Sequence, residues 1–487
     1  MEDKSLLIFC GRLEESSSLR TQLGIEDIFS LQLKGKSYRS QLKTLSRNVS
    51  KYYDTVWDSR LSLNPTVATV QDFLIHKVPS WRNYRNLMIY SVRLFFKDAE
   101  LWRTTLEKAA FSDRVVISDC KPGFCGIPSN ILESSKSTDR RILDLSDAIE
   151  MRTNGNTLDI GSVVGLFEVS RISSSERHFN EFRKESAYLI KRSTRADKAE
   201  QEHRFLSTLP APVRPFYPQV GEYRKINGAQ EYEIEFLPLF DASRLFIHAA
   251  VAPENFSSLL DKVTTYLDAC PRKGVSVEQY REAMTRLFVN KLQNRFEELQ
   301  QMAIWPKIRD FAEFSYSGGL PALVAELCKQ LKLAIQRTKG DELIFSHGDL
   351  CLPNILYDRD RSIMKLVDPK GITCPDDAYL PWYYDLAKLS HSILGGYDLI
   401  TNDCCQIDVR PDLSLKSSSH DLPDSYLIGV GEVFKKWVSS AGWDLRLMRL
   451  CEASLFLSML PLHAVQPNHM LLQIVAGYKA MAEAKES

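Results

Sequence analysis

The chain has 487 residues, a length that predicts about two to four domains. Hydrophobic residues make up 44% and charged residues 25%, the composition of a globular protein that can bury a sizeable core. Lysine plus arginine equals aspartate plus glutamate at 62 each, so no net charge is present to gather nucleic acid or an anionic membrane. Neither partner is expected.

Targeting and cysteine patterns point to a cytoplasmic protein. No run reaches the roughly 18 uninterrupted apolar residues of a membrane-spanning helix. Glu2 and Asp3 stand where a signal peptide would be basic. The ten cysteines are scattered without a Cys-x-x-Cys pair, which favours reduced, buried thiols over disulfides or zinc ligands.

The first part of the chain alternates strands with helices. Apolar runs of strand length occur at Leu6–Cys10 and Val115–Asp119, with helical spacing between them at Thr66–His76 and Ala99–Ala110. This alternation predicts a small α/β domain over residues 1–140, ended by a polar linker at Ser134–Asp139. No complete catalytic set occurs there, so an independent nucleotide- or sugar-modifying unit and a docking module both stay open.

The remainder divides into a strand-rich and a helical part. In residues 141–247, strands are predicted at Val163–Ile172, Ala187–Lys191 and Tyr232–Leu237, and a helix at Lys198–Leu209. In residues 248–487, apolar spacing of three and four predicts helices at Val277–Met302, Leu320–Gln336, Tyr426–Ser440 and Leu471–Ala484. The sequence therefore predicts a strand-rich small lobe followed by a helical large lobe.

The most informative motif is His347-Gly348-Asp349, with Asn354 five residues after the aspartate and Asp368 after the next hairpin. Phosphoryl transfer needs a carboxylate that orients the attacking hydroxyl and accepts its proton, and oxygen ligands for the Mg²⁺ that bridges the nucleotide phosphates. We therefore expect Asp349 to act as the base. Asn354 is expected to steady the catalytic loop and bind the metal, and Asp368 to supply the charged metal ligand.

These residues resemble the aminoglycoside phosphotransferase and choline kinase group of the wider protein-kinase-like fold. Tyr384–Leu389 resembles the Asp-Leu-Ala element of that group, in which Asp385 is expected to brace the catalytic loop, and His347 is expected to be a structural buttress. The resemblance is close over residues 345–395, diffuse over 141–480 and absent from the first 140.

What the resemblance implies is a bilobal, protein-kinase-like α+β fold after the additional N-terminal α/β domain. It also implies ATP and Mg²⁺ as cofactors and a hydroxyl of a small molecule (a sugar, polyol or amino alcohol) as acceptor. The loop looks most like kinase domains associated with bacterial surface-polysaccharide synthesis.

A kinase-like small lobe also needs a lysine that neutralises the nucleotide phosphates and a glutamate that holds this lysine. Lys191 ends the best strand, and Glu202 is the expected partner, with Glu200 as the competing one. Glu235 and Leu237 resemble the hinge that contacts adenine through its backbone. The cover over the phosphates stays open, and Gly161 with Gly165 is one possibility beside a plain turn.

The acceptor pocket is expected in the helical insert of about 250–340. Asp376 and Asp377 either contact a polyol or amine acceptor or form a solvated acidic turn. Two alternatives to a small-molecule kinase stay open: a protein kinase or nucleotidyl-transferring enzyme, and a non-catalytic nucleotide-binding scaffold. The lack of an Ala-Pro-Glu activation segment argues against the protein kinase.

Overall fold

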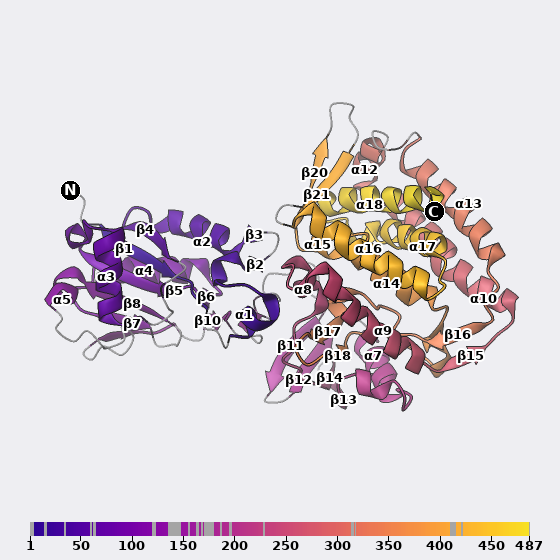
Figure 1. The fold of residues 1–487 in the computed structure, drawn as a ribbon, viewed down its shortest axis with the longest axis horizontal. Helices are drawn as coiled ribbons and strands as arrows, with labels where there is room; N and C mark the ends of the chain where they lie inside the picture. Colours follow the sequence, from indigo (N-terminus) through magenta and orange to yellow (C-terminus); the bar gives the residue numbers. More distant parts are fainter. Residues whose placement is uncertain are drawn as a thin grey trace. The chain divides into compact units, whose positions relative to one another are not determined.

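The computed structural model describes the chain except residues 1–3, 14–16, 34–35, 59–60, 62–64, 119–122, 135–147, 154–155, 162–164, 167–168, 170–179, 186–187, 194–196, 227–228, 313–315, 317, 410–414, 420–421 and 487. The chain folds as two compact units, Met1–Glu176 and Arg177–Ser487 (Figure 1). Among the described residues, no helix is both long enough and apolar enough to cross a lipid bilayer.

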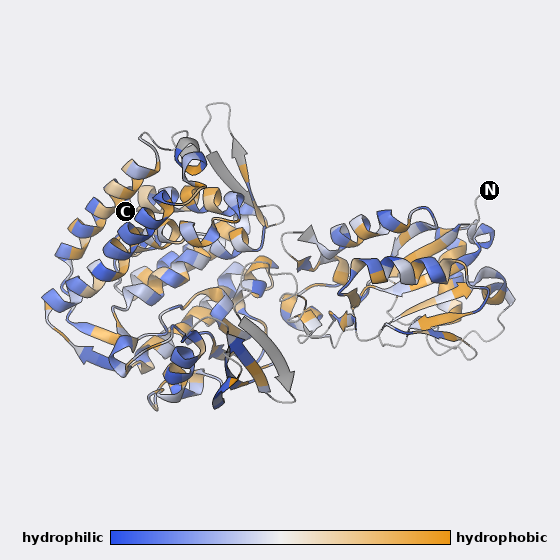
Figure 2. Ribbon diagram, turned by 180° about the vertical axis from the view of Figure 1, so that it is seen from behind, coloured by the Kyte–Doolittle hydropathy of each residue, from blue (hydrophilic) through white to orange (hydrophobic). Residues whose placement is uncertain are grey.

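The N-terminal unit is built on a six-stranded mixed sheet in the order β4-β1-β5-β8-β7-β9. Its strands are β1 (Ser5–Cys10), β4 (Tyr53–Asp58), β5 (Asn86–Ser91), β7 (Val116–Ser118), β8 (Phe124–Pro128) and β9 (Ile149–Met151). The strands β1, β4 and β5 run parallel, and every residue of β1 is buried, as expected for a central strand covered on both faces. Figure 2 shows these strands largely in the orange of hydrophobic residues.

The helices and short strands of this unit complete it. They are α1 (Ser18–Leu23), α2 (Tyr38–Ser46), α3 (Val67–Lys77), α4 (Ala99–Ala110), α5 (Ser129–Ser134), β2 (Gln32–Leu33), β3 (Lys36–Ser37), β6 (Leu94–Phe96) and β10 (Thr157–Asp159). The strands predicted at Leu6–Cys10 and Val115–Asp119 are present as β1 and β7, with Asp119 outside the described residues, and the two predicted helices are present as α3 and α4.

The division between the units differs from the predicted boundary at residue 140. The strand β9 pairs in parallel with β7, and β10 pairs with β6, so residues 149–151 and 157–159 belong to the N-terminal sheets and not to the small lobe. The predicted linker lies mostly outside the described residues. Of the strand predicted at Val163–Ile172, only Gly165, Leu166 and Val169 are described, and they are helical.

The C-terminal unit begins with a four-stranded antiparallel sheet in the order β11-β12-β14-β13. Its elements are β11 (Asn180–Glu185), β12 (Tyr188–Ser193), α7 (Lys198–Ser207), β13 (Val220–Ile226) and β14 (Ala229–Glu235). Lys191 on β12 lies opposite Tyr232 on β14. The helix α7 buries Ala199, Glu202, Phe205 and Leu206, whose spacing of three and four defines one face of a helix. This face positions Glu202.

The rest of this unit is mainly helical. Its helices are α8 (Ala242–Ile247), α9 (Ser257–Ala269), α10 (Val277–Met284), α11 (Lys291–Gln300), α12 (Trp305–Ala312), α13 (Gly319–Arg337), α14 (Tyr383–Ile393), α15 (Tyr397–Thr401), α16 (Asp424–Ser440), α17 (Leu445–Ser458) and α18 (Pro467–Glu486). Its strands are β15 (Arg272–Gly274), β16 (Glu342–Phe345), β17 (Ile355–Asp358), β18 (Ile363–Leu366), β19 (Tyr379–Leu380), β20 (Cys405–Val409) and β21 (Leu415–Ser419). The small strand-rich lobe followed by a helical lobe is the layout that the sequence predicts.

Two features of the helical lobe position the site. The helix α17 is buried at every position from Leu447 to Ser458, and α14 packs against it, which fixes α14 beneath the catalytic loop. Between α10 and α11 the helix passes through a π-helical turn, Thr285–Asn290, immediately before Lys291. Such turns carry one extra residue and often occur at functional sites.

Candidate active site

The loop that carries the predicted base is held from below by a buried carboxylate. Asp385, in the first turn of α14, is 0% exposed and accepts hydrogen bonds from the Ser346 hydroxyl at 2.7 Å, the His347 N–H at 2.9 Å and the Gly348 N–H at 2.8 Å. Burial raises the pKa of Asp385, and these donors together with His347 oppose that shift. Asp385 thus orders the backbone immediately before Asp349.

His347 has the geometry of a buttress. Its Nδ1 accepts the Asp349 N–H at 3.2 Å, so its Nε2 carries the proton that is donated to the Val367 carbonyl at 3.0 Å. Burial lowers the pKa of His347. A neutral ring therefore ties the catalytic loop to the residue that precedes Asp368.

Gly348 is required by conformation and by space. Its φ is +74°, a left-handed value that favours glycine, and a Cβ there would lie 2.6 Å from Cβ of Lys370. The stem of Lys370 therefore packs directly on the catalytic loop, and the Lys370 N–H donates to the His347 carbonyl at 2.9 Å.

Asp349 and Asn354 are brought together as predicted. Nδ2 of Asn354 donates to the Asp349 carbonyl at 2.8 Å and to Oδ2 of Asp349 at 3.2 Å. The Asp349 side chain is 37% exposed, so a substrate hydroxyl can reach it. Its other oxygen, Oδ1, forms an ion pair at 2.8 Å with Nζ of Lys388, a residue that the sequence reasoning did not single out. Burial acts to lower the pKa of Lys388, but Asp349 and neighbouring groups outweigh burial and raise it.

Lys191 lies between two carboxylates. Its Nζ is 2.6 Å from Oε2 of Glu202 and 2.7 Å from Oδ1 of Asp368, while the lysine is only 1% exposed. Burial acts to lower the pKa of Lys191, but Asp368, then Tyr232 and Glu202, outweigh burial and hold the pKa well above its ordinary value. The predicted lysine, its helix partner and the predicted metal ligand therefore form one contact chain.

The loop after Asp368 reaches α7 through a close backbone approach. A Cβ on Gly371 would lie 2.6 Å from Cβ of Gln201, and the Ile372 N–H donates to the Gln201 carbonyl at 3.1 Å. Asp368 itself has a φ of +54°, a sparsely populated conformation for a residue with a side chain. Contacts between the two lobes thus hold Asp368 beside Lys191.

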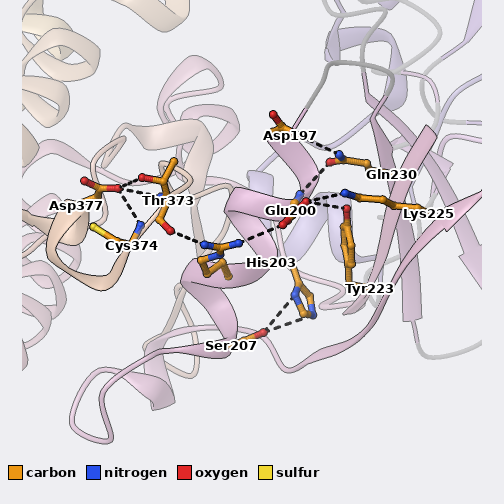
Figure 3. A network of polar contacts seen from close by, with 11 residues as sticks. Asp197, Glu200, His203, Ser207, Tyr223, Lys225, Gln230, Thr373, Cys374 and Asp377 are labelled. Atoms are coloured by element: carbon orange, nitrogen blue, oxygen red, sulfur yellow. Dashed lines mark hydrogen bonds and ion pairs between the residues drawn. The ribbon is translucent and has the colours of Figure 1, made fainter. Parts of the chain in front are cut away.

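Glu200, the competing partner for Lys191, belongs to an exposed network instead (Figure 3). Its carboxylate pairs with Lys225 at 3.0 Å and Arg204 at 3.1 Å, and it accepts a bond from the Tyr223 hydroxyl at 3.3 Å. Arg204 also donates to the Thr373 carbonyl, so this network is a second connection between α7 and the loop after Asp368.

Asp377, at the far end of that network, has a structural role. One of its oxygens accepts the N–H groups of Thr373 at 2.9 Å and Cys374 at 3.0 Å, besides the Thr373 hydroxyl. The Thr373 side chain and the Cys374 backbone lower the pKa of Asp377 to about 2. Asp376 pairs with Lys273 at 3.0 Å and has 74% of its side chain exposed. These contacts are those of an acidic surface turn.

The hinge residues make backbone contacts of two kinds. The Glu235 N–H donates to the Gln219 carbonyl at 2.8 Å, and its carboxylate accepts the Gln219 N–H at 3.0 Å, so Glu235 is engaged within the small lobe. The Leu237 carbonyl accepts the Leu239 N–H at 2.8 Å. No hydrogen bond from the Leu237 N–H occurs among the described residues. Gly161, considered for the phosphate cover, lies in the N-terminal unit against the Arg93 side chain.

The oxygen atoms near Asp368 fit a magnesium ion. Nδ2 of Asn354 donates a hydrogen bond within the catalytic loop, so the side-chain oxygen Oδ1 is the atom of this amide left to bind a cation. The Asp368 carboxylate is 42% exposed. The Val367 N–H donates to the backbone carbonyl of Asn354 at 2.9 Å, which joins the segment that carries Asn354 to the segment that carries Asp368. Hard oxygen donors of this kind are what Mg²⁺ prefers. In the described part of the chain, no cluster of three or more His, Cys, Asp or Glu side chains forms a metal site.

Neither a family model nor a curated protein matches the sequence. Among solved structures, the apo form of a thermostable mutant of aminoglycoside phosphotransferase APH(4)-Ia has 12% identity and a TM-score of 0.35, covering 63% of this chain and 94% of that one. A thermostable mutant of the same enzyme in ternary complex with AMP-PNP and hygromycin B has 12% identity and a TM-score of 0.35, covering 66% and 98%. Choline kinase from Cryptosporidium parvum Iowa II has 11% identity and a TM-score of 0.30, covering 65% and 92%. Similarity at this level does not establish activity or ligands, so function must be inferred from the contacts of the site.

Glu202→Gln should weaken nucleotide binding and Glu200→Gln should not. Removing the charge of Glu202 takes one of two charged partners from the buried Lys191 and leaves its ion pair with Asp368, and a charged hydrogen bond of this kind is worth about 1.5–3 kcal/mol. We expect the Kd for Mg²⁺·AMP-PNP to rise on the order of tenfold in Glu202→Gln and to stay within about twofold in Glu200→Gln. Calorimetric titration measures both, and equal effects of the two changes would contradict the assignment of Glu202.

Asp385→Ala should destabilise the fold. The change removes the acceptor of three buried donors, of which the Gly348 N–H keeps the Ser346 hydroxyl as a second acceptor, and the expected loss of unfolding free energy is on the order of 3 kcal/mol. Asp376→Ala, which removes an exposed carboxylate from a surface pair, should cost less than about 1 kcal/mol. Urea denaturation measures both, and a neutral Asp385→Ala would show that the brace does not order the loop.

Proposed function

We propose that residues 177–487 form an ATP- and Mg²⁺-dependent phosphotransferase that acts on a hydroxyl group of a small molecule. Two sets of contacts support the proposal. In the first, Lys191 contacts Glu202 and Asp368. In the second, Asp349 contacts Asn354 and Lys388. The first set suits a nucleotide and its metal, and the second suits an attacking hydroxyl. The loop and the His347 ring hold the two sets together.

In this proposal Asp349 orients the acceptor hydroxyl and takes its proton. The hydroxyl oxygen forms a bond to the γ-phosphorus of ATP, the bond from that phosphorus to the β,γ-bridging oxygen breaks, and ADP leaves. Magnesium, held by Asp368 and Asn354, supplies neutralisation of the phosphate charge when bound. Lys191 binds the nucleotide phosphates, Glu202 keeps Lys191 in place, and the Leu237 N–H contacts the adenine.

The acceptor in this proposal is a sugar, polyol or amino alcohol. We further propose that the reaction belongs to the cytoplasmic metabolism of surface-polysaccharide precursors. The support for this is the sequence of the catalytic loop, which resembles kinase domains associated with bacterial surface polysaccharides. The N-terminal unit has no catalytic role in this scheme.

Asp349→Asn should separate nucleotide binding from turnover. Loss of the base is expected to lower phosphate transfer by about 10²–10⁴-fold, because proton transfer and orientation are lost together. The Kd for Mg²⁺·AMP-PNP should change by less than about threefold, since Asp349 is outside the Lys191 contact chain. Label from γ-labelled ATP is followed into the small-molecule pool of a cell extract. Transfer at the wild-type rate would contradict the base assignment, and label on protein would favour a protein kinase.

Asp368→Asn should remove the dependence of nucleotide binding on magnesium. With Mg²⁺, AMP-PNP is expected to bind on the order of tenfold more weakly to the variant than to wild type, because one charged metal ligand is lost. In EDTA the two proteins should bind it equally, or the variant more tightly, because no carboxylate then competes with the nucleotide for Lys191. An unchanged effect of Mg²⁺ in the variant would exclude Asp368 as a metal ligand.

A further inference from the structure

Three lysines from different segments gather around the buried Tyr384, beside the proposed base. Lys291 begins α11, Lys370 follows the Asp368 loop, and Lys388 lies one turn after Tyr384 on α14. Nζ of Lys291 is 3.1 Å from the Tyr384 hydroxyl and 5.5 Å from its ring centre, and Nζ of Lys370 is 5.8 Å from the same ring centre. Lys388 holds Oδ1 of Asp349 at 2.8 Å.

The positive charge of this cluster exceeds what the neighbouring carboxylates offset. Asp349 pairs with Lys388, whereas neither Lys291 nor Lys370 forms an ion pair with any carboxylate in the described part of the chain. Burial acts to raise the pKa of Tyr384, but Lys291, Lys388 and Lys370 reverse that effect and lower the pKa below its ordinary value. The chain as a whole is neutral, so the excess is local.

The position of Lys291 favours a contact with the acceptor over one with the nucleotide. It comes from the helical insert where the acceptor pocket is expected, and no contact links it to Lys191 or Asp368 among the described residues. The π-helical turn Thr285–Asn290 directly precedes it. One extra residue in that turn rotates all later positions of the helix by about 100°, so the turn decides which way Lys291 faces.

We propose that the acceptor carries a phosphate or carboxylate group close to the hydroxyl that is phosphorylated, and that Lys291 and Lys370 bind this anion. The proposal rests on the phosphotransferase function above and narrows its acceptor. Amino alcohols and amino sugars are disfavoured, because a cation placed beside Asp349 would face two unpaired ammonium groups. The reaction that supplies this substrate must therefore deliver an acidic or already phosphorylated hydroxyl compound.

Four compounds with one sugar ring test the proposal: glucuronate and glucose 6-phosphate as the two kinds of anion, glucose as the neutral reference and glucosamine as the cation. Their affinities are measured by calorimetry on the full chain with Mg²⁺·ADP bound, at about 0.15 M salt so that distant charges are screened. We expect at least one anionic sugar to bind on the order of tenfold more tightly than glucose, and glucosamine to bind more weakly than glucose. The better anion identifies the acceptor group.

Variants assign the preference to the cluster. Lys291→Gln should reduce the advantage of the anionic sugar to about twofold, and Lys291→Arg, which keeps the charge, should retain most of it. Lys329→Gln, which removes an exposed lysine of α13, is the matched control and should leave the preference unchanged. An anionic preference that survives in Lys291→Gln would overturn the role of Lys291.

The outcomes also separate this inference from the function on which it rests. If Mg²⁺·ADP fails to bind, the phosphotransferase assignment fails. If Mg²⁺·ADP binds but both anionic sugars bind no better than glucose, or glucosamine binds best, the assignment stands and the anionic acceptor is wrong.

Discussion

The site depends on one constraint, which is that Lys191 is both charged and buried. Lys191 is 1% exposed, and an ammonium group so deeply buried stays charged only if carboxylates surround it. Glu202 comes from α7 in the small lobe, and Asp368 comes from the loop after β18 in the large lobe. Because Lys191 pairs with both carboxylates, it fixes the position of α7 relative to the loop after β18. Asp368 keeps 42% of its side chain exposed, and in the phosphotransferase that we propose it turns from Lys191 to a metal when a nucleotide binds.

The difference in burial between Asp385 and Asp349 gives these two carboxylates different roles. Asp385 is fully buried and accepts hydrogen bonds from the Ser346 hydroxyl and from two backbone N–H groups. It therefore orders the loop and is not accessible to a substrate. Asp349 is 37% exposed and is held by Asn354 and Lys388, so it is fixed in place yet reachable. Positioning groups beneath an exposed reactive group are what preorganisation requires.

Short-range spacing made much of the site predictable. Asp349 and Asn354 lie in one loop, so their contact follows from a gap of five residues. Lys191 was recognisable as the lysine of a predicted strand, although the strand β12 continues to Ser193. The sequence favoured Glu202 over Glu200 as the partner of Lys191 but left Glu200 as a competitor, because both lie on α7 and only the packed face decides which is buried. Lys388 and Lys291 were missed because a lysine within a helical pattern ordinarily faces water. The helix α17 was missed because it is buried on all sides and so lacks the polar face by which a surface helix is recognised. The domain boundary was placed too early, at residue 140, because the pairing of β7 with β9 is non-local and cannot be read from sequence.

The most direct test of the central claim is a crystal structure of the full chain with AMP-PNP and Mg²⁺. We predict a metal ion bound by Asp368 and the side-chain oxygen Oδ1 of Asn354, with Nζ of Lys191 on the nucleotide phosphates and still paired with Glu202. We also expect the γ-phosphate to face Asp349. A nucleotide bound elsewhere, with Lys191 still closed on Asp368, would contradict it.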